Sequence, residues 1–560
     1  MSKIFKISSQ ELLALLTPII LIIPNIALNF TEHLSVLSAI TNIILPLGVY
    51  LFLTTYFRKI GITVWCLLPI MIYCGFQIVL LYLYGCSIIG VDMFLNVVTS
   101  NATEIAELLG NLIIAIGSLI IVYIPALVYA SICISKKRIL SNTFMSKWNK
   151  VGIVTTITGT ILLSASYALT PDFSITNDIF PVNVSKNLVL AFKRHSQSDN
   201  YPKTSRNFTY NAKSTHNDSI PEIYVVVIGE TSRAEDWQLL GYKRETNPEL
   251  SKANNLTAMP KAFTQSATTH KSVPMLLSPL TANDFDSIAN RKSVITAFKE
   301  AGFYTSFFSN QKRNHSYTEF FSEEADTTIY LPDFSAKQPY DEELISLLEK
   351  QIGNKSHNKQ LIVLHTYGSH FNYAERYPAS HSFFKPDSKT DANKKDRQQL
   401  VNAYDNTIRY VDYYLKQAID TLNNTGVSAA LLYSSDHGED IYDDERGRFL
   451  HASPVPTYFQ LHVPMIVWTS DKFTELFPTK VSALAANKNK IVSSTVSIYN
   501  TLIDLAGINT YYYDEEGSLA SNKFTSPKLL FLSDRNEPVT IDSTTINIID
   551  YNNLMAKIKE

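Results

Sequence analysis

The stretch IYVVVIG at residues 223–229 is a continuous apolar run of about the length of one strand, and it decides the fold of the second half of the chain. Three further short apolar runs have the same character: LIVL at 361–364, AALLY at 429–433 and PMIVW at 464–468. Strands that are apolar on both faces are typical of mostly parallel sheets that are buried on each side. These runs therefore predict strands at the centre of a sheet.

Segments with helical spacing of apolar residues separate these runs. They cover residues 291–301, 340–352 and 396–423. Alternation of strands and helices predicts an α/β fold, with a mostly parallel sheet and helices on both of its faces. In such sheets ligands bind beyond the carboxyl ends of the strands. We therefore expect any chemistry in this half of the chain to lie there.

Chemically active side chains directly follow three of the four apolar runs. They are Glu230 after the first, His365 and His370 after the second, and Asp436 and His437 after the third, with His451 one loop later. Each of them alone has an ordinary explanation, such as a histidine of the surface or the core. Together, Glu, Asp and His at adjoining strand ends form the oxygen and nitrogen ligand set that zinc favours. The sequence therefore predicts a metal site.

A hydroxyl group would complete this set as a nucleophile. The segment QSATTHKSVP at 265–274 offers Thr268, Thr269 and Ser272. A serine or threonine hydroxyl is a weak nucleophile until a base or a metal ion activates it. Composition alone does not choose among the three hydroxyls, and a solvated loop is the ordinary explanation of such a segment.

Composition divides the chain into two parts. Of the 560 residues, 46% are hydrophobic and 18% are charged, against about 25% charged in an average soluble protein. The 49 Lys and Arg nearly balance the 51 Asp and Glu, for a net charge of −2. A nucleic-acid-binding protein would show a basic excess, so we expect no nucleic-acid partner. Because the apolar residues concentrate before about residue 170, a wholly soluble protein is excluded.

Five apolar stretches have the roughly 20-residue length that spans a bilayer. They are 11–30, 36–57, 62–84, 109–134 and 151–170. Lys and Arg precede the first stretch and lie between the second and third and between the fourth and fifth, whereas the other two loops, 31–35 and 85–108, have none. The positive-inside rule therefore predicts a cytoplasmic N-terminus and places everything after residue 170 outside.

We expect three regions from these patterns. Residues 1–172 form a five-helix transmembrane domain, 173–219 a linker, and 220–560 the α/β domain. Within the linker, residues 184–194 have the pattern of an amphipathic helix that lies on a lipid surface. In the loop 85–108, the residues Asn96, Ser100 and Glu104 recur every four positions and would form one polar stripe on a helix; their spacing alone favours a solvated helix face.

The chain resembles the phosphoethanolamine transferase family over essentially its whole length. These are bacterial inner-membrane enzymes with five spans and a periplasmic domain like those of alkaline phosphatases and sulfatases; they include the lipid A and mobile colistin-resistance enzymes. The matching motifs are VIGETSR (227–233), GYKRETNP (241–248), SVP (272–274), the stretch 364–378, NAYDN (402–406) and SDHGE (435–439). Within 364–378, SHFNY at 369–373 is close to the form seen in Kdo-modifying members.

The resemblance implies a role for each site residue. The family's zinc would be held by Glu230, Asp436, His437 and a threonine oxygen. The nucleophilic threonine stands three residues before Ser-Val-Pro, which here is Thr269. His370 and His451 fall on histidines that contact the substrate phosphate or a second zinc. The remaining implied substrate-binding residues are Asn96, Ser100, Glu104 and Lys312, with Arg313 nearly as good a match as Lys312.

The implied reaction is a two-step phosphoryl transfer by a monomeric, zinc-dependent enzyme of the inner membrane, with its catalytic domain in the periplasm. Thr269 would attack phosphatidylethanolamine and release diacylglycerol, with His370 or His451 protonating the leaving oxygen. Lipid A, Kdo or a core sugar of lipopolysaccharide would then take the group from the phospho-threonine. The added amine would weaken the attraction of the glycolipid for cationic peptides, as in polymyxin resistance.

Three other functions are alternatives to this transfer reaction. A phosphoglycerol transferase shares the plan but takes its headgroup from phosphatidylglycerol; the SVP and SHFNY motifs and His451 favour the ethanolamine family. A true sulfatase needs an Arg two residues after the Pro of its modification motif, where this chain has Leu276. A non-enzymatic sensor would lack metal ligands, yet every expected ligand is present.

Overall fold

The computed structural model describes residues 7–32, 34–85, 88–99, 113–171, 173–354, 357–388 and 393–560. These residues form two compact units, one from 7–95 and 113–193 and one from 96–99 and 194–560. The first unit is helical, and the second is built on a seven-stranded sheet.

Apolar helices make up the first unit. They are α1 (Ser9–Leu21), α2 (Ile23–Thr31), α3 (Val36–Tyr56), α4 (Ile60–Cys66), α5 (Leu68–Tyr84), α6 (Val91–Thr99), α8 (Ile113–Ser135), α9 (Asn142–Leu169) and α10 (Ile175–Asp178). Three segments are long and apolar enough to cross a membrane, namely Ser9–Thr31, α3 and α9. Helices α4 and α5 are bent by 51° against each other, so the described residues contain up to four spans if this pair counts as one.

The expected count of five spans is therefore not confirmed. The predicted stretch 109–134 falls on α8, of which Leu119–Ser135 is apolar but shorter than the other candidates, and residues 100–112 lie outside the described ranges. The predicted stretch 62–84 is interrupted at Leu67, and Pro69 follows in the first turn of α5. Proline has no N–H to donate and is tolerated in the first turn of a helix, so it favours a new helix at this point.

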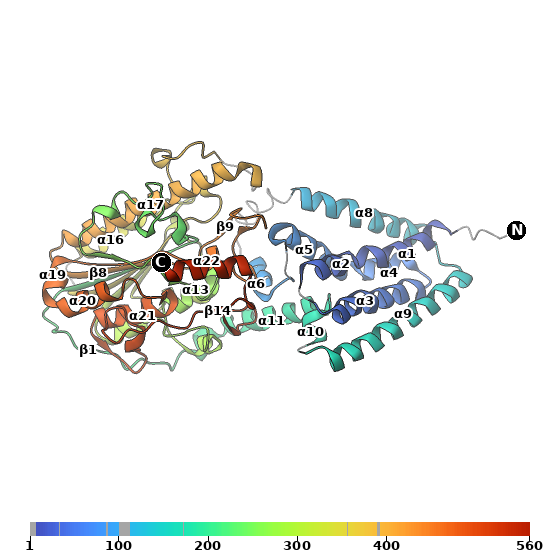
Figure 1. Ribbon diagram of the computed structural model, residues 1–560, viewed down its shortest axis with the longest axis horizontal. Coiled ribbons are helices and arrows are strands. Elements are labelled where there is room, and N and C mark those ends of the chain that lie inside the picture. Colours follow the sequence, from blue (N-terminus) through green and yellow to red (C-terminus); the bar gives the residue numbers. More distant parts are fainter. Residues whose placement is uncertain are drawn as a thin grey trace. The chain divides into compact units, whose positions relative to one another are not determined.

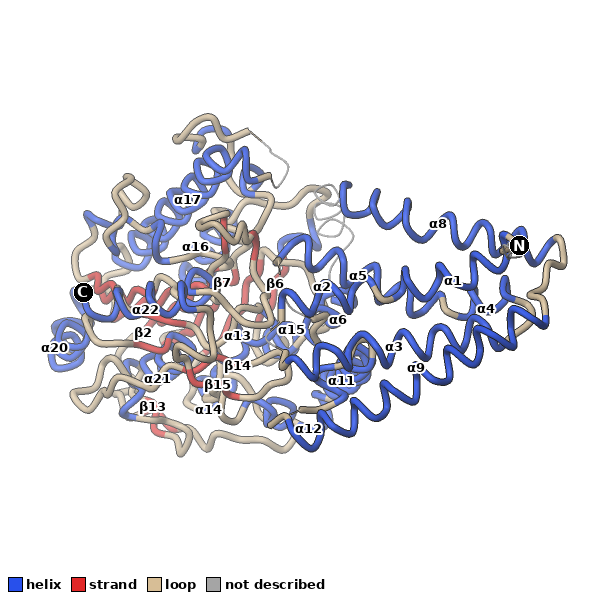
Figure 2. The backbone as a smooth tube through the Cα atoms, turned by 45° about the vertical axis from the view of Figure 1, so that its right-hand side comes forward, coloured by secondary structure: helices blue, strands red, loops and turns tan. Residues whose placement is uncertain are grey.

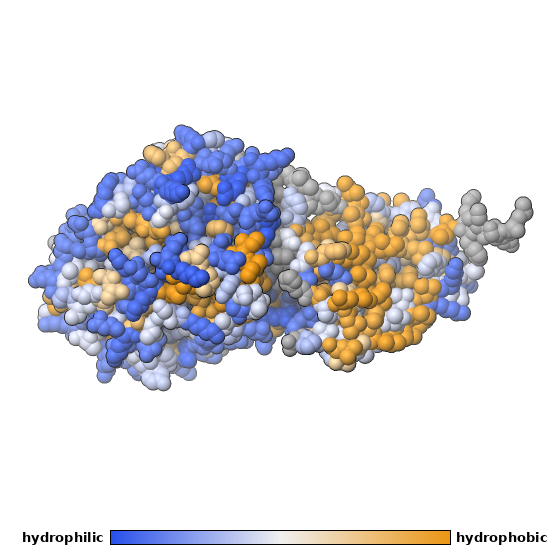
Figure 3. All heavy atoms as spheres, viewed as in Figure 1, coloured by the Kyte–Doolittle hydropathy of each residue, from blue (hydrophilic) through white to orange (hydrophobic). Residues whose placement is uncertain are grey.

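Glycine lets α3 and α9 approach each other closely. A Cβ atom at Gly159 would lie 2.5 Å from the Cα of Leu45, and one at Gly48 would lie 2.5 Å from the backbone nitrogen of Thr156. Small residues at such positions are typical of helices that pack within a bilayer. Figure 3 shows hydrophobic side chains over much of the visible face of these helices, as expected of a surface that faces lipid.

Residues 173–219, the predicted linker, contain regular elements. They are α10, α11 (Val182–Asp199), α12 (Tyr201–Thr204) and β1 (Lys213–Ser214). The amphipathic pattern of 184–194 lies within α11, where Val189 and Phe192 are exposed. Tyr201 and Tyr210 are buried in the core of the second unit. Burial of these isolated aromatic side chains explains why an otherwise polar stretch is ordered.

The central sheet contains the four predicted strands. Its spatial order is β3 (Leu256–Ala258), β11 (Met465–Thr469), β8 (Ser428–Ser435), β2 (Glu222–Gly229), β7 (Lys359–His365), β5 (Tyr304–Ser309) and β6 (Thr327–Tyr330). Strands β8, β2, β7, β5 and β6 are mutually parallel, whereas β11 runs antiparallel to both β8 and β3. The predicted sheet is thus confirmed as mostly parallel, and β11 makes it mixed.

Four two-stranded ladders lie outside the central sheet in the described part of the chain. They are β1 with β13 (Ile508–Asn509), β9 (Asp440–Ile441) with β10 (Phe449–Leu450), β4 (Ala262–Phe263) with β12 (Val492–Ser493), and β14 (Leu530–Leu532) with β15 (Pro538–Thr540).

Helices cover both faces of the central sheet (Figures 1 and 2). One face carries α13 (Thr269–Leu276), α14 (Val294–Glu300), α15 (Tyr317–Ser322) and α21 (Ser494–Leu505), and the other carries α16 (Glu343–Gly353) and α17 (Arg397–Asn423). The remaining helices are α18 (Tyr458–Leu461), α19 (Asp471–Leu476), α20 (Pro478–Asn487) and α22 (Ile548–Lys559). Along β2, Tyr224 and Val226 face the first core while Val225 and Val227 face the second. Successive strand residues point to opposite faces, so a strand between two helical layers is apolar throughout.

Candidate active site

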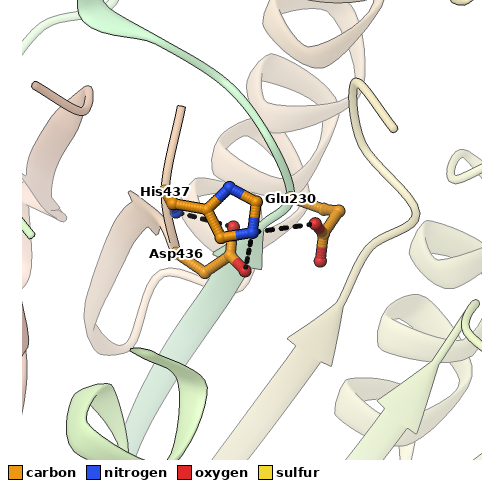
Figure 4. A group of neighbouring side chains, drawn as sticks. All are labelled: Glu230, Asp436 and His437. Carbon is orange, nitrogen blue, oxygen red and sulfur yellow. Dashed lines mark hydrogen bonds and ion pairs between the residues drawn. The ribbon is translucent and has the colours of Figure 1, made fainter. Parts of the chain in front are cut away.

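Two neighbouring parallel strands bring three candidate ligands together. Glu230 directly follows β2, and Asp436 and His437 directly follow β8. One ligand atom from each of the three lies within 4.8 Å of the others, and all three side chains are buried (Figure 4). Nε2 of His437 is 3.2 Å from Oδ2 of Asp436 and 3.6 Å from Oε1 of Glu230. His365, at the end of β7, is not a member of this cluster, and its Nδ1 lies 3.1 Å from the hydroxyl of Ser309.

The loop after β7 lies against the backbone of Glu230. Gly368 in this loop has φ of 54°, and a Cβ atom there would lie 2.6 Å from the carbonyl oxygen of Glu230. The next residue, Ser369, donates its backbone N–H to that same oxygen at 2.9 Å. Only glycine adopts this conformation readily and leaves room for so close an approach.

Asp436 has one carboxylate oxygen without a hydrogen-bond donor in the described structure. Its Oδ1 accepts the backbone N–H groups of Thr231 at 3.1 Å and His437 at 2.7 Å. Its Oδ2 is buried and accepts no hydrogen bond within the described part of the chain. Burial raises the pKa of Asp436 to about 7, and burial followed by the nearby Asp436 raises that of Glu230. Two adjacent buried carboxylates with an unsatisfied oxygen fit a bound cation.

The tautomer of His437 suits metal binding. Its Nδ1 lies 3.0 Å from the carbonyl oxygen of Gly438, which only accepts hydrogen bonds, so Nδ1 carries the hydrogen and Nε2 keeps its lone pair. Burial lowers the pKa of His437, which favours the neutral ring. A neutral imidazole and two carboxylates are a ligand set that zinc accepts, with a fourth position left for another oxygen. The residues present therefore fit a zinc ion.

Thr269 supplies the hydroxyl nearest to this cluster among the three candidates. As the first residue of α13, it places Oγ1 3.3 Å from each carboxylate oxygen of Glu230 and 3.2 Å from Nε2 of His437. The hydroxyl of Thr268 instead lies 3.0 Å from that of Ser266, and Ser272 donates its hydroxyl to the backbone oxygen of Thr268 at 2.7 Å. Of the three hydroxyls that the sequence left open, the structure thus brings that of Thr269 to the cluster.

His370 and His451 lie close to the same cluster. The ring of His451 is 4.3 Å from that of His437 and 6.1 Å from that of His370, measured between centroids. Nδ1 of His370 lies 2.7 Å from the carbonyl oxygen of Phe371, and Nδ1 of His451 lies 3.3 Å from Oε2 of Glu439. The carbonyl of Phe371 only accepts hydrogen bonds, so it favours hydrogen on Nδ1 of His370 and the lone pair on Nε2 of that ring. Burial, followed by His437 and His370, lowers the pKa of His451 well below its usual value.

Comparison with known proteins places this arrangement in a family. Residues 222–508, just over half of the chain, match the family described as Sulfatase, and this range contains β2, β8, Thr269 and the three clustered ligands. The chain belongs to the sulfatase family. Its sulfatase-family region supplies every residue of the cluster described above.

Known relatives of this sulfatase-family chain are phosphoethanolamine transferases. The chain is 30% identical over 341 residues to the Kdo(2)-lipid A phosphoethanolamine 7''-transferase of Escherichia coli strain K12, a match that covers 58% of each protein. The chain thus matches less than two thirds of that relative's length. The resemblance to phosphoethanolamine transferases that the motifs indicated is confirmed.

Two solved structures share the fold. The integral membrane protein lipooligosaccharide phosphoethanolamine transferase A from Neisseria meningitidis covers 91% of this chain and 98% of its own, with 21% identity and a TM-score of 0.72. The C-terminal periplasmic domain of EcEptC from Escherichia coli in complex with zinc covers 61% of this chain and 98% of its own, with 25% identity and a TM-score of 0.54.

Of the other predicted substrate-binding residues, Lys312 lies within the sulfatase-family region, and Asn96, Ser100 and Glu104 precede it in the sequence. Lys312 is exposed in the loop after β5. Its neighbour Arg313 forms ion pairs with Glu319 and Asp333 and lies over the ring of Tyr330. The residues Ser100 and Glu104 lie outside the described residues, as does the side chain of Asn96 on α6.

Sequence reasoning missed two residues that contact the site. Gln311 donates from Nε2 to Oε2 of Glu230 at 2.9 Å, and Glu439 lies beside Nδ1 of His451. Gln311 comes two residues after the end of β5, so the rule that polar residues after parallel strands share one sheet edge would have found it. Glu439 lies inside the SDHGE motif, but nothing in the sequence indicates that it contacts His451.

Proposed function

We propose that this protein transfers phosphoethanolamine from phosphatidylethanolamine to lipopolysaccharide, at lipid A, Kdo or a core sugar, through a covalent intermediate on Thr269. The observation that carries this proposal is the position of the Thr269 hydroxyl among Glu230 and His437. The similarity to phosphoethanolamine transferases supports the choice of group and of acceptor class.

Zinc is the proposed cofactor, held by Glu230, Asp436, His437 and the hydroxyl of Thr269. When bound, zinc supplies positive charge that favours ionisation of a hydroxyl and stabilises a phosphoryl group under attack. Support comes from the unsatisfied Oδ2 of Asp436 and from the lone pair on Nε2 of His437. This ligand set holds one zinc ion. His370 and His451 would contact the substrate phosphate or bind a second zinc ion.

In the first step, a bond forms between Oγ1 of Thr269 and phosphorus, and the bond from phosphorus to the diacylglycerol oxygen breaks. His370 or His451 takes the proton that the Thr269 hydroxyl loses and passes it to the leaving oxygen as general acid. Thr269 stands at the N-terminus of α13, where the partial positive charge of the helix favours the developing negative charge.

In the second step, a hydroxyl or phosphate oxygen of the acceptor attacks phosphorus, and the bond to Oγ1 of Thr269 breaks. The proton of an attacking hydroxyl passes through the same histidine to Oγ1 of Thr269. The zinc site, His370 and His451 would stabilise the negative charge on the phosphoryl oxygens in both steps. This stabilisation contributes most of the rate enhancement in such transfers. Lys312, Asn96, Ser100 and Glu104 are the proposed contacts to the lipid substrates.

The proposed location is the bacterial inner membrane, with the catalytic domain in the periplasm and the protein acting as a monomer. The apolar helices of the first unit support a membrane location, because donor and acceptor are both amphiphiles. Addition of an amine to an anionic glycolipid would reduce its attraction for cationic peptides such as polymyxin.

Mass spectrometry of the purified, zinc-loaded protein tests this proposal. The protein is incubated separately with phosphatidylethanolamine and phosphatidylglycerol and then digested. We expect a phosphoethanolamine adduct on the peptide that contains Thr269, with release of diacylglycerol, and loss of both in Thr269→Ala. A phosphoglycerol adduct would instead show a phosphoglycerol transferase, and no adduct from either lipid in zinc-loaded protein would refute the proposed donor or nucleophile.

A further inference from the structure

A side-chain amide connects the ends of three strands at the proposed metal site. Gln311 follows β5, and its Nε2 lies 2.9 Å from Oε2 of Glu230 after β2 and 2.9 Å from the carbonyl oxygen of Thr366 after β7. Because a backbone carbonyl only accepts hydrogen bonds, the atom that faces Thr366 is the amide nitrogen. Both hydrogens of this nitrogen are therefore directed, one to each partner.

The backbone around Gln311 is fixed by further hydrogen bonds. Its own N–H donates to the hydroxyl of Ser309 at 3.0 Å. The preceding residue, Asn310, donates its backbone N–H to the carbonyl oxygen of His365 at 2.8 Å and its side-chain amide to Asp341 at 2.8 Å. The Gln311 amide is thus held in place before any ligand binds.

The carboxylate of Glu230 accepts hydrogen bonds from neutral donors in the described structure. Oε1 accepts the hydroxyl of Thr231 at 2.7 Å, and Oε2 accepts the amide of Gln311. The hydroxyl of Thr269 also lies 3.3 Å from each oxygen. These donors are neutral, so they orient the carboxylate plane without forming an ion pair with it. Hydrogen bonds of this kind orient metal ligands, and their loss typically weakens metal affinity about 10- to 100-fold.

We propose that Gln311 is a positioning residue for zinc binding, which holds the carboxylate of Glu230 in the orientation that the metal requires. The inference rests on the proposed zinc site, and it gives Gln311 a role through its hydrogen bond to Glu230 and not as a metal ligand.

Gln338 provides a matched control. Its Nε2 donates to the backbone oxygen of Asn310 at 2.6 Å and also lies 3.2 Å from that residue's side-chain oxygen. Gln311→Met and Gln338→Met each remove a side-chain amide that contacts the segment after β5, while keeping a side chain of similar length. Of the two, Gln311 alone contacts Glu230 among the hydrogen bonds of the described residues.

The test is the zinc dissociation constant of metal-stripped, full-length protein, measured by competition with a chromophoric chelator. We expect Gln311→Met to bind zinc about 10- to 100-fold more weakly than the parent protein, and Gln338→Met to bind within twofold. Gln311→Glu, which replaces the donor with a second carboxylate, should also bind more weakly than the parent if orientation by a donor is what matters.

The outcomes separate the two claims. Zinc binding by Gln311→Met within twofold of a parent protein that binds one ion tightly would overturn the role of Gln311 and leave the proposed function intact. A parent protein that binds no zinc would refute the metal site itself. Equal weakening in Gln311→Met and Gln338→Met would show general loosening of the loop and would also overturn the proposal.

Discussion

The hydroxyl oxygen of Thr269 lies 3.2 Å from Nε2 of His437, although 168 positions separate the two residues in the sequence. Thr269 begins α13, and His437 follows β8. The contact therefore depends on how α13 packs against the sheet. In the described structure, Thr269 is the only one of the three candidates whose hydroxyl reaches the cluster.

Thr269 and Thr268 should respond differently to substitution. We expect Thr269→Ala to reduce turnover by at least about 1000-fold, because a nucleophile is lost. Thr268→Ala removes the contact with Ser266, which costs about 1 kcal/mol of stability, and should leave turnover within a few fold. The measurement is transfer rate with phosphatidylethanolamine, with melting temperature as the folding control. Comparable losses in both variants would contradict the assignment of Thr269.

Removal of the metal should destabilise the protein. A ligand that binds only the folded state stabilises it by about 4 kcal/mol at a free concentration 1000 times its dissociation constant. We expect a chelator to lower the melting temperature and zinc to restore it, whereas Asp436→Asn should lose both responses. Asp440→Asn is the control, because Asp440 is buried but bonded to Thr457 and Gln460 instead. A zinc response that survives in Asp436→Asn would count against Asp436 as a ligand.

Glycine at the contact of α3 and α9 should be sensitive to a single methyl group. Ala is favoured over Gly inside a helix by about 1 kcal/mol, but a Cβ at position 159 would lie 2.5 Å from the Cα of Leu45. We therefore expect Gly159→Ala to lower the melting temperature of the detergent-purified protein. At Gly75 in α5 the nearest atom to a Cβ is a side-chain carbon of Leu119 at 3.4 Å, so Gly75→Ala should be tolerated. Equal effects of the two substitutions would argue against close packing at Gly159.

Substitutions at Lys312 and Arg313 should affect different properties: substrate binding for Lys312 and stability for Arg313. Arg313 is engaged with Asp333 at 3.2 Å, with Glu319 at 3.4 Å and with the ring of Tyr330. We expect Arg313→Ala to cost about 1 kcal/mol of stability or less with little change in kcat/KM. Lys312→Ala should lower kcat/KM about 10- to 100-fold through loss of a charge-assisted contact, with a loss of stability no larger than that of Arg313→Ala. The opposite pattern would make Arg313 the substrate-binding residue.

Local pattern was sufficient for four of the seven strands of the central sheet, whereas β3, β5 and β6 were not predicted. The apolar runs at 223–229 and 429–433 became β2 and β8, and the helical spacing at 396–423 became α17. These elements are predictable because burial of a strand on two faces, or of a helix on one, leaves a direct pattern in the sequence. The break between α4 and α5 was missed, because hydropathy alone does not show where a helix stops; Pro69, in the first turn of α5, is the local signal for it.

The sequence by itself determined the candidate ligand types and their placement after the strands: Glu230 after one apolar run, and Asp436 and His437 after another. Residue types alone left Thr268, Thr269 and Ser272 open, and only the family resemblance implied Thr269. The tertiary structure places the hydroxyl of Thr269, and not those of the other two, beside the cluster. It also decided the contact between Gln311 and Glu230. Such contacts join residues far apart in sequence through the packing of helices and strand ends, and no local periodicity records that packing.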